Sequence, residues 1–132
     1  MTRYMLDTNI VSHLLRSHPR VTRRLVKTQM SAVCISSITK GELLFGLAKR
    51  QNAKSLNTLV SEFLNRIEVL PWDSVTAEQY GPVRAEMERK GKLLGPLDML
   101  IAAHALAVKV TLVSSDKTFR QVAGLRIEDW TV

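Results

Sequence analysis

The chain has 132 residues, of which 45% are hydrophobic and 23% are charged, and its formal net charge is +7. This length and composition predict one globular domain over residues 1–132, large enough to bury a core without disulfides. The single cysteine, Cys34, excludes an internal disulfide, and it lies in an apolar run that favours an inert buried thiol. The excess of positive charge favours a polyanionic partner, either nucleic acid or a membrane surface.

No segment indicates export or membrane insertion. Asp7 interrupts the N-terminal region where a signal peptide needs an unbroken apolar stretch. The most apolar stretch, residues 99–108, contains His104 and is too short to span a bilayer. We therefore expect a cytoplasmic protein without a membrane partner.

Short apolar runs alternate along the chain with segments of helical period. In chain order we expect a strand at Tyr4–Leu6, a helix at 10–15, a strand at Val33–Ile35, a helix beginning near Glu42, a helix at 56–64, a strand at 67–70, helices at 75–90 and 97–108, and a strand at Thr111–Val113. Strands separated by helices predict an α/β fold, with a mainly parallel sheet and helices on both faces. Ligands of such folds bind beyond the carboxyl ends of the strands.

Four acidic residues are predicted at that edge of the sheet. Asp7 directly follows the first strand, and Asp116 follows the last. Glu42 lies near the start of the helix after the second strand, and Asp98 lies in the first turn of the apolar helix. The sequence therefore predicts that four carboxyl groups meet at one pole of the fold.

Two interpretations of these acids remain open. Asp7 and Asp116 could be helix N-caps, Thr39 and Glu42 match a capping box, and Asp98 suits the helix dipole. Four carboxylates at one rim repel one another, however, unless a cation lies among them. Oxygen ligands of this kind suit Mg²⁺ or Mn²⁺. A basic surface around such a site is what an enzyme that cleaves phosphodiesters needs.

Four motifs in this order resemble the PIN-domain ribonucleases, and more narrowly the VapC toxins of bacterial toxin–antitoxin pairs. The motifs are Met5-Leu6-Asp7-Thr8-Asn9, then Ser36-Ser37-Ile38-Thr39 with Glu42, then Gly95-Pro96-Leu97-Asp98 with Ile101-Ala102-Ala103-His104-Ala105, then Leu112-Val113-Ser114-Ser115-Asp116 with Phe119. The resemblance covers essentially the whole chain, including Gly124-Leu125-Arg126 and Glu128-Asp129-Trp130 near its end.

The resemblance implies a three-layer α/β/α sandwich and a Mg²⁺- or Mn²⁺-dependent endoribonuclease. Asp7, Glu42 and Asp98 match the main metal-binding acids of the family, and Asp116 matches a fourth, more variable position where some members carry Asn. Asn9 matches a polar position that supports the site, and Ser114 stands where many relatives have Thr.

The resemblance also implies partners. A VapB-like antitoxin would place a helix near the apolar residues 43–47, and a homodimer interface would lie close by. The RNA substrate would be structured, because aromatic residues for stacking along a single strand are scarce. Some VapC toxins cut the initiator transfer RNA in its anticodon loop, whereas others cut different transfer or ribosomal RNAs.

Other functions fit the sequence less well. Metal-free acid–base cleavage would need histidines at the site, but the settings of His13, His18 and His104 favour core or surface roles. A phosphatase-like hydrolase with Asp7 as nucleophile lacks a second nearby aspartate for acid–base work. A non-catalytic RNA-binding module would not need all four acids.

Several basic residues are candidates for RNA contact. Three clusters are Arg20-Arg23-Arg24-Lys27, Lys49-Arg50-Lys54 and Arg84-Arg89-Lys90-Lys92. Lys40, Lys117 and Arg120 are close in sequence to the acids, and we expect them to contact phosphates.

Overall fold

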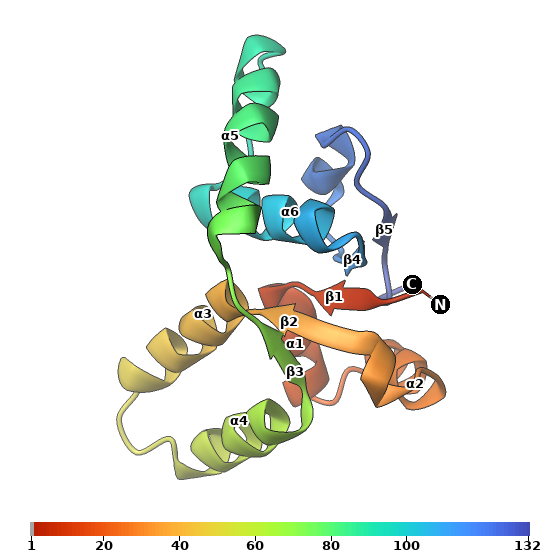
Figure 1. The fold of residues 1–132 in the computed structure, drawn as a ribbon. Coiled ribbons are helices and arrows are strands. Elements are labelled where there is room, and N and C mark those ends of the chain that lie inside the picture. Colours follow the sequence, from red (N-terminus) through yellow and green to blue (C-terminus); the bar gives the residue numbers. More distant parts are fainter. Residues whose placement is uncertain (1) are drawn as a thin grey trace.

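The computed structural model describes residues 2–132 and contains a five-stranded sheet in the order β3-β2-β1-β4-β5, in which every pairing is parallel (Figure 1). The strands are β1 (Tyr4–Leu6), β2 (Val33–Ser36), β3 (Glu68–Leu70), β4 (Thr111–Val113) and β5 (Ile127–Glu128). The predicted parallel sheet is thus confirmed, with β1 at its centre.

Helices connect these strands, and polar caps start several of them. The helices are α1 (Thr8–Leu15), α2 (Pro19–Lys27), α3 (Ser37–Ala48), α4 (Lys54–Arg66), α5 (Ser74–Arg89) and α6 (Pro96–Val108), with short 3-10 turns η1 (Met30–Ala32) and η2 (Lys117–Gln121). Asp7, Ser36 and Asp73 each accept a backbone N–H of the helix that follows. Within residues 2–132, no helix combines the length and apolar character that a membrane crossing requires.

Two hydrophobic cores lie on opposite faces of the sheet, because successive strand residues point to opposite sides. Met5 of β1 packs in the core beneath α5, α6 and η2, whereas Leu6 packs in the core beneath α1 to α4. Figure 1 shows the same division, with α5 and α6 on one side of the strands and α1, α3 and α4 on the other. The three-layer α/β/α sandwich is therefore confirmed.

Cys34 lies in the first of these cores and is fully buried, as expected. Burial raises the pKa of its thiol to about 11. The side chain therefore stays a neutral thiol at physiological pH, which is the inert role that the sequence predicted.

Two elements were not predicted, and one helix start was wrong. Helix α2 begins after His18, whose Nδ1 accepts the N–H of Val21 at 3.3 Å, so this histidine caps a helix. Strand β5 has only two residues. Helix α3 begins at Ser37 instead of near Glu42, because the Ser36 hydroxyl caps it.

The chain changes direction across the sheet between β1 and β4. After β1 it enters α1, which contributes Ile10 to one core, and after β4 it enters η2, which contributes Phe119 to the other core. Two adjacent parallel strands that feed opposite faces leave a crevice at their carboxyl ends, where open α/β sheets bind ligands. Asp7 and Asp116 follow these two strands.

Candidate active site

Asp7 both caps a helix and lies buried at the end of β1. Its Oδ1 accepts the N–H of Ile10 at 2.8 Å, and only 3% of the residue is exposed. Burial raises the pKa of its carboxyl group to about 6, against the opposing effect of hydrogen bonds from the Ser114 hydroxyl and the Ile10 N–H. The cap interpretation is thus confirmed for Asp7. The raised pKa shows, however, that the cap hydrogen bond does not fully offset the cost of burying an ionised carboxyl group at this position.

Asp98 lies in the first turn of α6, which Pro96 starts. Burial is the largest cause that raises the pKa of its carboxyl group, and the charges of Asp116 and Glu42 raise it further. The same electrostatic effect acts on Asp7, whose pKa is also raised by Asp98 and Asp116. Each of the four predicted acids therefore lies within electrostatic reach of at least one other.

Glu42 lies in the second turn of α3, so the capping-box interpretation of Thr39 and Glu42 is wrong. Thr39 is buried inside the helix instead. The Glu42 carboxylate accepts the Thr8 hydroxyl at 2.6 Å. Thr8 directly follows Asp7, and this contact links the helix after β2 to the residue after β1. Sequence reasoning missed Thr8, although it stands between two residues that the motif singled out.

Asp116 caps η2 and is tied to Ser114. Its Oδ1 accepts the backbone N–H of Thr118 at 2.9 Å and the Thr118 hydroxyl at 2.8 Å, which confirms the cap interpretation. Its own N–H donates to the Ser114 hydroxyl at 3.0 Å. Since the Ser114 hydroxyl also hydrogen-bonds Asp7, this buried serine connects two of the four acids. That it supports a metal site stays a prediction.

Asn9 is exposed in the first turn of α1. Among the hydrogen bonds of residues 2–132, none joins its side chain to one of the four carboxylates. Its supporting role stays a prediction.

The four carboxyl groups interact electrostatically, but they do not surround a common point. Among residues 2–132, no three acidic, histidine or cysteine side chains are placed tightly enough to hold a metal ion together. A cation held by three or more of these carboxylates would therefore require rotation of at least one of the side chains. The donor set itself, four carboxylates with a serine and a threonine hydroxyl beside them, has the oxygen chemistry that hard divalent cations prefer.

The three histidines do not join the acids, as expected. His104 is buried and its Nδ1 lies 2.8 Å from the Ser36 hydroxyl oxygen. His18 caps α2, and the ring of His13 packs against that of His18 at a centroid distance of 5.1 Å.

Two hollows adjoin Glu42 and share Thr8 and Gly46 in their walls. The first has a volume of about 190 Å³, and its remaining wall is apolar with two basic residues: Ser12, Leu15, Arg16, Leu43, Leu47, Arg50, Leu56 and Val60. The second has a volume of about 590 Å³ and is also lined by Ser37, Ile38, Gly41, Phe45, Lys49 and Leu97. Glu42 therefore stands where two surface hollows meet.

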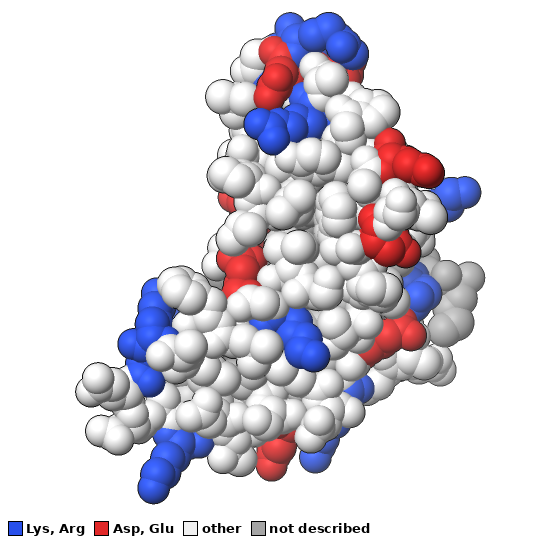
Figure 2. Space-filling model, turned by 60° about the vertical axis from the view of Figure 1, so that its left-hand side comes forward, with Lys and Arg blue, Asp and Glu red and all other residues white. Residues whose placement is uncertain are grey.

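Much of the basic charge elsewhere is paired with acids. Arg24 of α2 donates to Glu128 at 2.7 Å and stacks over Trp130, while Arg84, Arg89 and Lys90 pair with Glu88 or Glu86 on α5. Figure 2 shows blue and red side chains intermixed at the upper end of the molecule, where α5 ends. Two of the three basic clusters are thus partly neutralised within the fold.

Comparison with known proteins identifies the fold and its class. The sequence profile of the PIN domain matches residues 4–125, and the chain belongs to this family. Its full-length relatives are VapC proteins. The tRNA(fMet)-specific endonuclease VapC of Shigella flexneri is 36% identical over 132 residues, which cover 99% of this chain and all of that one. The tRNA(fMet)-specific endonuclease VapC of Salmonella typhimurium is 37% identical over 98% of this chain and 99% of that one.

Solved structures agree with this assignment. The crystal structure of DNA-bound VapBC from Salmonella typhimurium contains a chain that superposes with a TM-score of 0.91 at 37% identity, over 98% of this chain and 99% of that one. VapBC2 of Rickettsia felis, bound to a fragment of its promoter, gives a TM-score of 0.89 at 32% identity over similar shares, 98% and 99%. The resemblance to VapC toxins is therefore confirmed along the whole chain.

Proposed function

We propose that this chain is the toxin of a bacterial type II toxin–antitoxin pair, a Mg²⁺- or Mn²⁺-dependent endoribonuclease that cleaves a structured RNA and so inhibits translation. The observation that carries the proposal is the electrostatic coupling of Asp7, Glu42, Asp98 and Asp116 at the carboxyl ends of β1 and β4. The initiator transfer RNA is the first candidate substrate, because two relatives at 36% and 37% identity are named for it.

The four carboxylates would hold the ion, each from a different segment of the chain. A bound divalent cation lowers the pKa of water and offsets the charge that develops on the phosphate. Hydrogen bonds from Ser114 and from the Ile10 N–H favour the ionised form of Asp7 against the effect of burial. The Thr8 hydroxyl orients the carboxylate of Glu42.

Basic residues beside Glu42 would contact the RNA backbone. Arg16 and Arg50 line the smaller hollow next to Glu42, and Lys49 lines the larger one. The ion pairs of residues 2–132 involve none of these three, whereas Arg24 and Arg84 are paired with glutamates. These three join Lys40, Lys117 and Arg120 as the residues that we expect to meet phosphates.

The smaller hollow would receive the antitoxin. Its floor of Leu43, Leu47, Leu56 and Val60 suits the apolar face of a helix, and Arg16 and Arg50 at its rim suit acidic residues on that helix. The solved relatives are VapBC complexes, which supports a VapB-like partner. A homodimer belongs to the same proposal, since Phe45 and Leu97 in the larger hollow are 65% and 45% exposed and would be covered by a second copy.

A cleavage assay with analysis of the product ends tests the proposed function. Purified protein is incubated with initiator transfer RNA, with and without EDTA, and then with added Mg²⁺ or Mn²⁺. We expect cleavage that EDTA stops and the metals restore, with 3′-hydroxyl and 5′-phosphate ends, because water rather than the 2′-hydroxyl attacks phosphorus. Cyclic phosphate ends, or cleavage that persists in EDTA, would contradict the mechanism. Retention of RNA without any cleavage would favour a non-catalytic module instead.

A further inference from the structure

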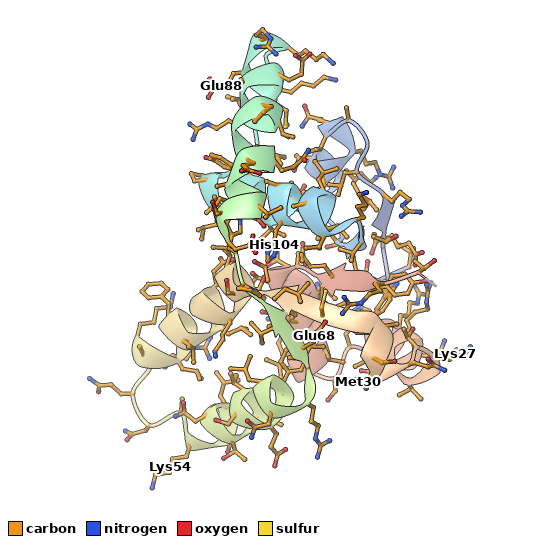
Figure 3. The ribbon with its side chains drawn as sticks, in the orientation of Figure 1. Lys27, Met30, Lys54, Glu68, Glu88 and His104 are labelled. Atoms are coloured by element: carbon orange, nitrogen blue, oxygen red, sulfur yellow. The ribbon has the colours of Figure 1, made fainter. Side chains whose placement is uncertain are left out.

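A buried histidine joins the two helices that carry Glu42 and Asp98. His104 lies on α6 six residues after Asp98, and it is fully buried. Its Nδ1 lies 2.8 Å from the hydroxyl oxygen of Ser36, which caps α3 by accepting the N–H of Ile38 at 3.1 Å. Figure 3 shows His104 between α6 and the strands, near the start of α3.

A tryptophan makes a second connection between the same two helices. Trp72 follows β3, and its backbone N–H donates to the Ser37 hydroxyl at 3.0 Å, at the first residue of α3. Its indole Nε1–H donates to the carbonyl of Leu100 on α6, also at 3.0 Å. Two independent polar contacts therefore fix α6 against the beginning of α3.

Packing alone does not explain a histidine at this position. Burial lowers the pKa of His104, so its ring is neutral. The Ser36 hydroxyl accepts the Ile38 N–H and keeps both its own proton and a second lone pair for the contact with Nδ1, so it suits either tautomer of the neutral ring. Its Nε2 is buried without a well-formed hydrogen bond, and a backbone contact with Pro71 only partly offsets the effect of burial on the pKa of the ring. Since a buried polar atom without a partner costs stability, an apolar residue of similar size would suit the core better.

We infer that His104 and Trp72 are positioning residues, which set the separation of Asp98 and Glu42 by holding α6 against the start of α3. The inference rests on the proposed function, because this separation affects catalysis only if the two carboxylates share an ion. Neither residue touches the substrate in this role. Their effect reaches the site through Ser36 and Ser37 on one side and through α6 on the other.

A matched pair of variants tests the role of the hydrogen bond. Asn and Leu have nearly the same shape, but only Asn places a polar atom where Nδ1 was. We expect His104→Leu to weaken Mn²⁺ binding and to lower kcat by about 10- to 100-fold each, with KM for RNA unchanged. His104→Asn should retain both within about threefold of the parent, since the Ser36 contact survives. Mn²⁺ affinity is measured by calorimetry, and folding is checked by thermal melts of both variants.

A third readout needs neither metal nor RNA. In metal-free protein, the amide resonances of Glu42 and Asp98 should both move in His104→Leu and stay near their parent positions in His104→Asn. Trp72→Phe, which removes the indole donor, should move the same two resonances as His104→Leu.

The outcomes separate this inference from the proposed function. Parent-like metal binding, kcat and amide resonances in His104→Leu overturn the inference while the ribonuclease stands. An equal loss of metal binding and kcat in His104→Asn and in His104→Leu also overturns the inference, because the side-chain volume rather than the hydrogen bond would then matter. If the parent protein neither cleaves RNA nor binds Mn²⁺ but the amide pattern holds, the proposed function fails and the positioning of the helices is retained.

Discussion

Two effects act in opposite directions on the charge of Asp7 at neutral pH. The N-terminus of α1 favours a negative charge at the capping position, whereas burial at 3% exposure penalises it. The pKa of about 6, compared with an ordinary value of 3.8, shows that burial is the stronger effect. A cation bound beside this buried carboxylate stabilises its ionised form by compensating its charge.

This conflict predicts a pH-dependent stability difference between the parent protein and Asp7→Asn. With the folded pKa above the unfolded one, the contribution of Asp7 to stability is fully present below about pH 4 and is lost as pH rises through about 6. Asn keeps the cap and stays neutral. Between pH 4 and pH 7, we therefore expect the free energy of unfolding of Asp7→Asn to rise relative to that of the metal-free parent, by about 3 kcal/mol at most.

Denaturant melts of both proteins across this pH range give the difference directly. Saturating Mn²⁺ should raise the stability of the parent and leave that of Asp7→Asn nearly unchanged. A stability difference that does not vary with pH would show that burial does not raise the pKa of Asp7.

A second prediction at the same scale concerns Asp98. Its carboxyl group is only half-buried and contributes no cap hydrogen bond to α6, so Asp98→Asn should fold normally. Because it removes one of the charges that the site shares, cleavage should fall by at least about a hundredfold. A single-turnover assay, with Asp73→Asn as a matched control for loss of an aspartate outside the site, measures this. Cleavage by Asp98→Asn at the rate of the control would contradict its role.

The positions of the four acids could be predicted from the sequence, but their contacts could not. Asp7 and Asp116 follow apolar runs that are recognisable as strands, and parallel strands bring their carboxyl ends to one edge. The contact of Thr8 with Glu42 joins residues 34 apart, and that of Ser36 with His104 joins residues 68 apart. No local pattern encodes such pairs, because each depends on how two helices pack.

At the scale of elements, α6 ends under local strain. Lys109 closes this helix in the left-handed conformation, with φ of 58°, and its side chain is exposed. This conformation costs a residue with a Cβ roughly 1–2 kcal/mol, which glycine avoids. Replacing Lys109 with glycine would remove this cost, but part of the gain in stability is offset by the greater conformational freedom of glycine in the unfolded chain.

Lys109→Gly should therefore stabilise the protein by about 0.5–1 kcal/mol without changing RNA cleavage. Lys109→Ala is the matched control, since it removes the same charge but keeps the strain, and it should bring no gain. Chemical denaturation measures both variants. An equal gain from Ala would assign the effect to charge instead of backbone conformation.

Short apolar runs and helical spacing of apolar residues made most elements predictable, and the failures have separate causes. The predicted strands and the helix at 97–108 match β1 to β4 and α6 within one or two residues. Helix α2 places Val21 and Leu25 in the core at helical spacing, but its many basic residues drew attention to charge, and the segment was considered only as a basic cluster. Strand β5 is too short for an alternating pattern. The start of α3 was misplaced because a serine cap at Ser36 competed with a capping-box pattern at Thr39.

For the whole molecule, the proposed activity predicts toxicity. Overproduction of the chain in a bacterium that carries the substrate RNA should arrest growth, and co-expression of the cognate antitoxin should restore it. Asp98→Asn, produced to the same level, should leave growth unaffected, which separates cleavage from the burden of expression. Normal growth with abundant folded parent protein would count against a toxin.

The central place of β1 in the sheet has a consequence for the time at which the site can form. Tyr4 of β1 pairs with Thr111 of β4, so the first strand made by the ribosome waits for one that is made about a hundred residues later. Closing a loop of this length is slow and comes late in folding. Asp116 follows β4, so the last of the four acids reaches the site only after β4 has been synthesised. A nascent copy therefore lacks the assembled set of four acids until β4 has left the ribosome and paired with β1.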